Sequence, residues 1–193
     1  MALLFLLHRS SNAAWTSNSN TLRVGLIGCG NRGTAAAGEA INADPNVVLV
    51  AMADAFDDRL QSSLATLKEK YKEKVQVPKE HQFVGLDAYQ KLIDTDVDVV
   101  LLVAPTAFRP DHFEAAVKAN KHIFAEKPFA VDAPGLRRVM DAVEVARKKK
   151  LSVVSGFCWR YHLPKRETFE KVLKGQIGNI LTAESTYNPA ELW

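Results

Sequence analysis

Short apolar runs alternate with amphipathic segments along most of this chain. The runs are rich in Val, Ile and Leu and contain few polar residues, which is typical of parallel strands buried on both faces. The intervening segments place apolar residues at helical spacing, as at Leu60, Leu64 and Leu67. This alternation predicts an α/β fold with a doubly wound parallel sheet. Strands are predicted over 24–27, 47–53, 82–84, 97–103, 122–125 and 152–157, and helices over 35–43, 57–74, 87–93, 110–120 and 133–149.

Two of the predicted helices carry more detailed signals. Asp87 and Gln90 have the spacing of a reciprocal capping pair, with Asp87 at the N-cap of the helix over 87–93. The longer helix over 133–149 is amphipathic. Its apolar face is predicted to consist of Leu136, Val139, Met140 and Val143.

The pattern changes after residue 157. Pro164 is placed to open a helix over 164–174, and Gly175 is placed to end it. A turn over 176–178 and a strand over 180–187 follow, but no later segment offers that strand a partner. We therefore expect residues 158–193 to be the beginning of an incomplete α+β second domain, after a first domain over 21–157.

The first 20 residues have a different composition from the rest. The apolar stretch over 2–7 is too short to span a bilayer, and Arg9 follows it rather than preceding it. Residues 10–20 are rich in Ser and Asn, a flexible composition. We expect residues 1–20 to be a flexible leader on a cytoplasmic protein, with a remnant export signal as the alternative.

Overall composition narrows the class of function. The chain has 193 residues, of which 47% are hydrophobic and 24% charged, as in ordinary globular proteins. With 25 basic and 22 acidic residues the net charge is +3, which does not favour a nucleic-acid or membrane partner. Cys29 and Cys158 have no metal-ligand spacing, so we expect free thiols in a reducing compartment and no metal site.

A glycine-rich loop follows the first predicted strand. Gly28, Gly30 and Gly33 have G-x-G-x-x-G spacing between a strand and a helix, the setting in which this motif binds a dinucleotide. Gly28 allows the sharp turn, Gly30 lets a pyrophosphate approach the main chain, and Gly33 lets the helix pack closely. The amino end of the helix then presents free N–H groups to the phosphates. The predicted cofactor-binding residues here are Gly28, Cys29, Gly30, Asn31, Arg32 and Gly33.

An acidic residue closes the second predicted strand. Asp54 lies about 20 residues after Gly33, where a carboxylate accepts hydrogen bonds from the adenosine ribose. The alternative is that Asp54 caps the helix that begins near Asp57. The same charge repels a 2′-phosphate, so NAD is favoured over NADP. Arg32 and Arg59 keep NADP open, because either side chain can reach a phosphate.

Further motifs follow in a characteristic order. An Ala-Pro-Thr segment over 104–106 precedes His112, and 121–128 ends in Glu-Lys-Pro directly after a strand. Trp-Arg-Tyr over 159–161 and Gly-Gln-Ile-Gly over 175–178 come last. Together with the glycine loop and Asp54, these segments resemble the N-terminal part of the Gfo/Idh/MocA oxidoreductases. The Glu-Lys-Pro is the most specific of them, since many Rossmann folds share the glycine loop.

This resemblance implies hydride transfer between a sugar or cyclitol carbon and C4 of nicotinamide, in a full-length homo-oligomer. It also implies that Lys127 lies beside the nicotinamide and acts on the substrate hydroxyl, with Glu126 orienting the site and Pro128 in a cis or rigid turn. The chemistry is reasonable, because a partly buried lysine at the carboxyl edge of a parallel sheet can transfer protons. The alternative is a surface lysine paired with Glu126.

Other residues are assigned with alternatives. His112 is the second catalytic candidate, although it can equally cap its helix. Arg160 can hold a substrate oxygen near the nicotinamide, whereas Trp159 can be packing only. The remaining cofactor-binding candidates are Asp54, Arg59, Ala104, Pro105, Thr106, Glu126, Lys127, Trp159 and Arg160.

One part of the family pattern is missing. Family members carry an Asp-x-x-x-His pair in the second domain, and this chain ends before that position. The expected organisation is thus an NAD-binding domain over 21–157 and the start of a truncated substrate domain over 158–193. Alternatives are a redox-assisted glycosidase that uses bound NAD, a non-catalytic dinucleotide-binding module and a methyltransferase, although a methyltransferase does not need the Glu-Lys-Pro.

Overall fold

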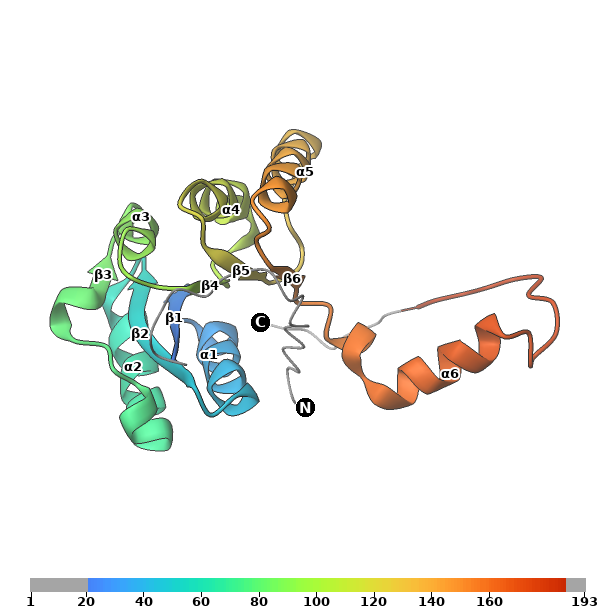
Figure 1. Cartoon of the computed structure of the whole chain (residues 1–193), viewed down its shortest axis with the longest axis horizontal. Coiled ribbons are helices and arrows are strands. Elements are labelled where there is room, and N and C mark those ends of the chain that lie inside the picture. The colour runs from blue at the N-terminus through green and yellow to red at the C-terminus, as the bar shows by residue number, and fades with distance from the viewer. Residues whose placement is uncertain (1–20, 187–193) are drawn as a thin grey trace. The chain divides into compact units, whose positions relative to one another are not determined.

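The computed structural model describes residues 21–186, so the predicted leader and the last seven residues lie outside it. The described residues divide into two compact units between Phe157 and Cys158. The first unit contains a sheet of six parallel strands in the order β3-β2-β1-β4-β5-β6 (Figure 1). The strands are β1 (Leu22–Ile27), β2 (Val47–Asp54), β3 (Gln82–Val84), β4 (Val99–Leu102), β5 (His122–Ala125) and β6 (Val153–Ser155).

Helices cover both faces of this sheet. Figure 1 shows α1 and α2 on one side of the strands and α3, α4 and α5 on the other. The predicted doubly wound α/β fold is therefore confirmed. The helices are α1 (Asn31–Ala43), α2 (Asp57–Tyr71), α3 (Ala88–Ile93), α4 (Arg109–Lys118) and α5 (Ala133–Lys148), with short 3-10 segments η1 (Lys72–Lys74), η2 (Lys79–His81) and η3 (Thr106–Phe108).

The strands divide their side chains between two hydrophobic cores. Successive residues of a strand point to opposite faces, so Leu101 of β4 packs with α1 and α2 while Leu102 packs with α3, α4 and α5. Both leucines are fully buried, as is Phe113 of α4. Each such side chain contributes roughly 1.5–3 kcal/mol of transfer free energy. Burial on both faces explains why the strand sequences are continuous apolar runs.

The strand order creates a crevice at the carboxyl edge of the sheet. The chain leaves β1 toward β2 on one side, whereas β4 is the neighbour on the other side. Ligands of open α/β sheets bind at such a switch point. Backbone bonds fix the loops that leave these strands: Gly28 N donates to Ala53 O at 2.9 Å, and Val103 N donates to Ile27 O at 2.8 Å.

Some details differ from the sequence predictions. Helix α1 begins at Asn31, four residues earlier than predicted, because the glycine loop leads directly into it. In α5, Leu136 and Met140 are 46% and 60% exposed, because the face that packs on α4 and the sheet is made of smaller residues. That face includes Val139, Ala142 and Ala146.

The predicted capping pair does not form. Asp87 does occupy the N-cap of α3, but no cap hydrogen bond reaches its side chain. Its carboxylate instead pairs with the Lys91 ammonium at 2.9 Å, one helical turn along. Gln90 donates its side-chain amide to the Tyr89 hydroxyl, and its side chain accepts no hydrogen bond from Asp87 N within residues 21–186.

The second unit contains η4 (Cys158–Tyr161) and α6 (Leu163–Leu173), which matches the predicted helix closely. The predicted strand over 180–187 was wrong for 180–186, which form no strand, and Tyr187 lies outside the described residues. A strand needs a hydrogen-bonded neighbour, and residues 21–186 supply none there.

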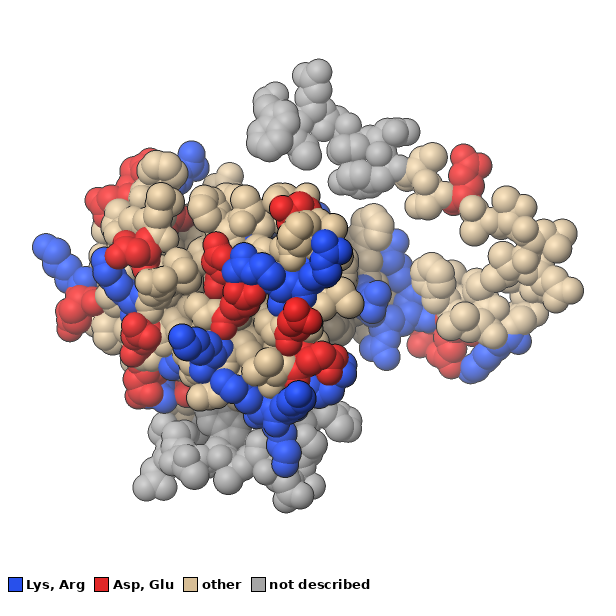
Figure 2. Space-filling view, turned by 90° about the horizontal axis from the view of Figure 1, so that it is seen from above, with Lys and Arg blue, Asp and Glu red and all other residues tan. Residues whose placement is uncertain are grey.

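Nowhere in that range is a helix long and apolar enough to cross a membrane. Figure 2 shows acidic and basic side chains interspersed on the face in view.

Candidate functional site

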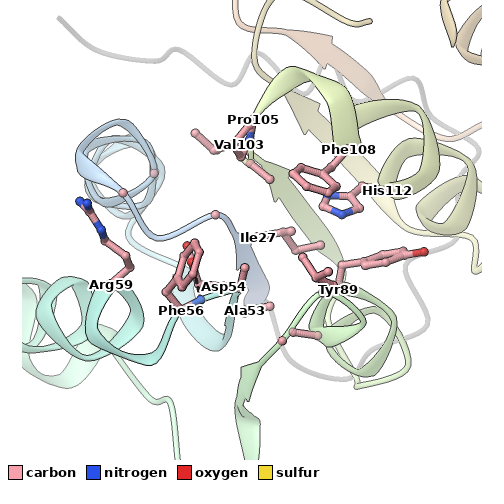
Figure 3. Close-up of a pocket in the computed structure, with 18 of the residues that line it drawn as sticks. Ile27, Ala53, Asp54, Phe56, Arg59, Tyr89, Val103, Pro105, Phe108 and His112 are labelled. Atoms are coloured by element: carbon pink, nitrogen blue, oxygen red, sulfur yellow. Dashed lines mark hydrogen bonds between the residues drawn. The ribbon is translucent and has the colours of Figure 1, made fainter. Parts of the chain in front are cut away.

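A pocket of about 440 Å³ opens at the carboxyl edge of the sheet, around the ends of β1, β2 and β4. This is within the usual range for small-molecule sites. In Figure 3, Asp54, Phe56 and Arg59 line one side, and Tyr89, Phe108 and His112 line the other. Among the predicted site residues, the pocket is lined by Gly28, Gly30, Arg32, Gly33, Asp54, Arg59, Ala104, Pro105 and His112.

The three loop glycines have different environments. Gly28 has φ of +98°, and a Cβ on it would lie 2.4 Å from Ala104 N. A Cβ on Gly33 would lie 1.8 Å from Gly28 O, so the helix can pack here only without a side chain. A Cβ on Gly30 would meet nothing within 4 Å. Gly28 and Gly33 therefore shape the turn, whereas the space beside Gly30 is open to a ligand.

Asp54 ties the glycine loop to the end of β2. Its Oδ2 accepts a hydrogen bond from Cys29 N at 2.6 Å, and its Oδ1 accepts one from Phe56 N at 3.0 Å. Phe56, not Asp54, is the N-cap residue of α2, and α2 has no side-chain cap bond. The capping interpretation of Asp54 is therefore wrong. Each carboxylate oxygen has a further lone pair, so both can still accept from a ligand hydroxyl.

The other loop residues face the pocket less directly. The Cys29 thiol is buried and donates to Ala53 O at 3.5 Å. Burial, together with the nearby Asp54 carboxylate, raises the pKa of this thiol, which is therefore unreactive. Asn31 is exposed in the first turn of α1, and Thr106 is half-buried in η3. None of these three side chains lines the pocket.

The two pocket arginines have different partners. The Arg32 guanidinium pairs with Glu126 at 2.5 Å and with Glu39 at 3.4 Å. Arg59 is exposed in the first turn of α2, and it makes no ion pair within the part of the chain that the structure describes. Arg59 is thus the better placed of the two to reach a ligand phosphate.

His112 belongs to an aromatic wall of the pocket. Its ring lies 4.2 Å from the Tyr89 ring and 6.1 Å from the Phe108 ring, measured between centroids. Only 6% of the residue is exposed, and its Nδ1 has no hydrogen-bond partner among residues 21–186. Burial, with the positive charge of Arg109, lowers the pKa of His112 to about 4. His112 is therefore a neutral imidazole near pH 7, and α4 has no side-chain cap that would support the capping alternative.

Glu126 and Lys127 follow β5 directly. Glu126 is buried and pairs with Arg32, so the surface ion pair between Lys127 and Glu126 is not observed. The Lys127–Pro128 peptide is cis, which was the first of the two alternatives predicted for Pro128. Lys127 itself is exposed, contrary to the partial burial we expected. Burial ends with Glu126, and Lys127 and Pro128 are both exposed in the segment that follows β5.

Two predicted residues fall in the second unit. Trp159 is in η4, with the Lys165 ammonium 4.3 Å from the centre of its ring. Arg160 is exposed in the same segment. Their proposed place near nicotinamide stays a prediction.

Three contributors to this region were not predicted from the sequence. Tyr89 and Phe108 form the aromatic wall with His112. Arg109 is 2% exposed and donates to Ala104 O at 2.5 Å and to Glu126 O. The only sequence signal for Arg109 is its place beside Pro110 at a helix start, which says nothing about its partners.

No group of His, Cys, Asp or Glu between residues 21 and 186 is arranged to hold a metal ion.

Comparison with known proteins agrees with the Rossmann-type fold. A sequence model of an oxidoreductase family with an NAD-binding Rossmann fold matches residues 22–157. The chain is 28% identical over 174 residues to dTDP-3,4-didehydro-2,6-dideoxy-alpha-D-glucose 3-reductase of Actinomadura kijaniata. It is 30% identical over 157 residues to myo-inositol 2-dehydrogenase of Thermotoga maritima. These alignments cover 89% and 81% of this chain, but 47% and 42% of the two relatives.

Solved structures show the same relationship. The crystal structure of myo-inositol 2-dehydrogenase from Lactobacillus plantarum matches with a TM-score of 0.68 and 27% sequence identity. The match covers 83% of this chain and 43% of that structure. The chain thus spans less than half the length of the relatives it matches.

Proposed function

This chain belongs to the Gfo/Idh/MocA oxidoreductase family, and we propose that its pocket binds NAD for hydride transfer to or from a sugar or cyclitol. The observation that carries the proposal is the open space beside Gly30 in a loop that Gly28 and Gly33 hold in shape. A pyrophosphate needs close access to the main chain at that point. Gly30 is also the N-cap of α1, whose first N–H groups and positive dipole end favour an anion.

The rest of the pocket suits the adenosine half of the cofactor. Asp54 lies on the pocket wall with hydrogen-bonding capacity left for ribose hydroxyls. Its negative charge disfavours a 2′-phosphate, which supports NAD over NADP. Arg59 works in the opposite direction, because it is a cation at the same end of the pocket. We propose that Asp54 determines the preference for NAD. Two backbone hydrogen bonds hold the Asp54 carboxylate in place, whereas the exposed Arg59 side chain loses conformational entropy when it binds a phosphate.

The chemistry requires a group that exchanges the proton of the substrate hydroxyl. When bound, nicotinamide supplies the hydride donor or acceptor. Lys127 is the proposed proton-exchanging group, because it follows β5 at the carboxyl edge that carries the glycine loop. The sugar and cyclitol enzymes named among the relatives support the substrate class. His112 is less suited to proton transfer, because its neutral imidazole is buried against Tyr89.

The test is hydride transfer by the protein that contains this chain. A panel of inositols and sugars is incubated with NAD, and formation of NADH is followed by absorbance. We expect turnover on at least one cyclitol or sugar and transfer of deuterium from a C-deuterated substrate to the cofactor. Binding of NADH without turnover on any polyol would support a non-catalytic module instead. Release of sugar from a glycoside without net NADH formation would support a redox-assisted glycosidase.

We also propose that the protein is cytoplasmic and forms a homo-oligomer in its full-length form. Cys29 and Cys158 are both free thiols, which suits a reducing compartment. Light scattering after size-exclusion chromatography would test the oligomer, and a monomer at micromolar concentration would contradict it.

A further inference from the structure

The N–H, the carboxylate and the carbonyl of Glu126 each make a hydrogen bond. Its N–H donates to Leu102 O at 3.0 Å, which extends the pairing of β4 with β5 by one residue. Its carboxylate accepts from Arg32 Nε at 2.7 Å. Its carbonyl accepts from Arg109. This carbonyl belongs to the peptide that joins Glu126 to Lys127, so Arg109 fixes the orientation of the backbone from which the Lys127 side chain departs.

The neighbouring Gly156 leaves space for the Glu126 carboxylate. A Cβ on Gly156 would lie 2.8 Å from Glu126 Oε2, so the absence of a side chain there makes space for the carboxylate. Gly156 N donates to Ala125 O at 2.8 Å, which keeps the glycine beside the end of β5. The partner of the Glu126 carboxylate is also fixed in position, because Arg32 belongs to the first turn of α1.

Arg109 also holds a second loop. Its other terminal nitrogen donates to Ala104 O at 2.5 Å, at the start of the Ala-Pro-Thr segment. One planar guanidinium thus joins the loops that leave β4 and β5. A lysine presents a single ammonium in place of this fork, so it is a poor substitute for two carbonyls in different directions. Arg109 is buried, and its Nε has no hydrogen-bond partner within residues 21–186, an arrangement with a desolvation cost.

We propose that Arg109 is a positioning residue, which aligns Lys127 with the cofactor pocket by clamping the carbonyls of Ala104 and Glu126. The inference rests on the proposed function, because it assigns Lys127 to the substrate hydroxyl. Misplacement of a catalytic group by about 1 Å can cost roughly a hundredfold in rate. A side chain that never touches substrate can therefore control turnover without contributing to cofactor affinity.

The test compares Arg109→Lys and Arg109→Met with a matched control, Lys149→Met. Lys149 also donates to carbonyls of α4, those of Val117 and Lys118, but at the other end of the helix. Backbone ¹⁵N order parameters are measured at Thr106 and Lys127, with NADH affinity and turnover measured alongside. We expect order parameters at both sites to fall from about 0.85 to below about 0.6 in the Arg109 variants and to stay unchanged in the control. Turnover should fall about tenfold to a hundredfold, with NADH affinity within about threefold.

The outcomes separate this inference from the proposed function. Folded Arg109 variants with unchanged order at Lys127 would overturn the inference, as would failure of both variants to fold, which would make Arg109 purely structural. Absence of NADH binding and turnover in the unsubstituted protein would instead overturn the proposed function. The order parameters would still decide whether Arg109 holds the two loops.

Discussion

Replacing Gly30 and Gly33 separately should distinguish a ligand-binding loop from a simple turn. Gly30 is the N-cap of α1 and Gly33 lies in its first turn, yet the structure gives their side-chain positions opposite surroundings. A Cβ at Gly33 would be 1.8 Å from Gly28 O and 2.9 Å from Gly28 C, both backbone atoms that cannot rotate away. A Cβ at Gly30 would meet nothing within 4 Å. Gly33→Ala should therefore damage the fold, and Gly30→Val should damage ligand binding.

The magnitudes follow from these contacts. Overpacking costs about 1–3 kcal/mol, and Gly33→Ala should reach the upper end because the backbone itself must move. For a chain of this size, about 3 kcal/mol lowers Tm by roughly 6–12 °C. Gly30 has φ of −70° and ψ of −176°, a conformation that valine adopts freely. Its replacement should change stability by less than about 1 kcal/mol, since the poorer N-cap is offset by a less flexible unfolded chain.

The assay pairs thermal unfolding with calorimetric titration of NADH. For Gly30→Val we expect a near-normal Tm and at least about a hundredfold loss of NADH affinity, about 2.7 kcal/mol. Saturating NADH should raise the Tm of the unsubstituted chain and leave that of Gly30→Val unchanged. A folded Gly30→Val variant with normal NADH affinity would refute the reasoning and leave the loop as a turn only.

Two further predictions concern other residues of the site. Lys127→Met should keep NAD affinity within a few-fold while turnover falls by roughly two to four orders of magnitude, and joint loss of both would make Lys127 a cofactor ligand. Because the folded state lowers the pKa of His112 from 6.5 to about 4, the unfolded state binds more protons between these values, and stability is lost as pH falls through that window. Urea unfolding at pH 7 and pH 5 should show about 2 kcal/mol less pH dependence in His112→Phe than in the unsubstituted chain, and equal pH dependence would contradict the burial argument.

Local pattern was enough to predict the fold. The strand His122–Ala125 and the helix from Ala133 were located closely, because apolar periodicity reports burial directly. The loop glycines were predictable from their G-x-G-x-x-G spacing between a strand and a helix, although the contact that excludes a side chain at Gly28 comes from the distant Ala104. Leu136 and Met140 were misplaced because helical spacing identifies an apolar face but not which side of it the neighbours cover.

The contacts that hold the site could not be predicted. Arg32 and Glu126 are 94 residues apart in sequence, and their pairing depends on β5 lying two strands from β1. Arg109 acts on backbone carbonyls, which carry no sequence signature. The exposure of Lys127 likewise depends on tertiary contacts, which the local pattern does not report.

The most direct test of the account is calorimetric titration of the chain with NADH and, separately, with NADPH. The proposal requires one binding site, formed by the glycine loop and Asp54. We predict one NADH per chain and at least about tenfold tighter binding than NADPH, a difference of roughly 1.4 kcal/mol. Equal affinities or tighter NADPH would contradict the role of Asp54, and absence of binding by either dinucleotide would contradict the pocket assignment itself.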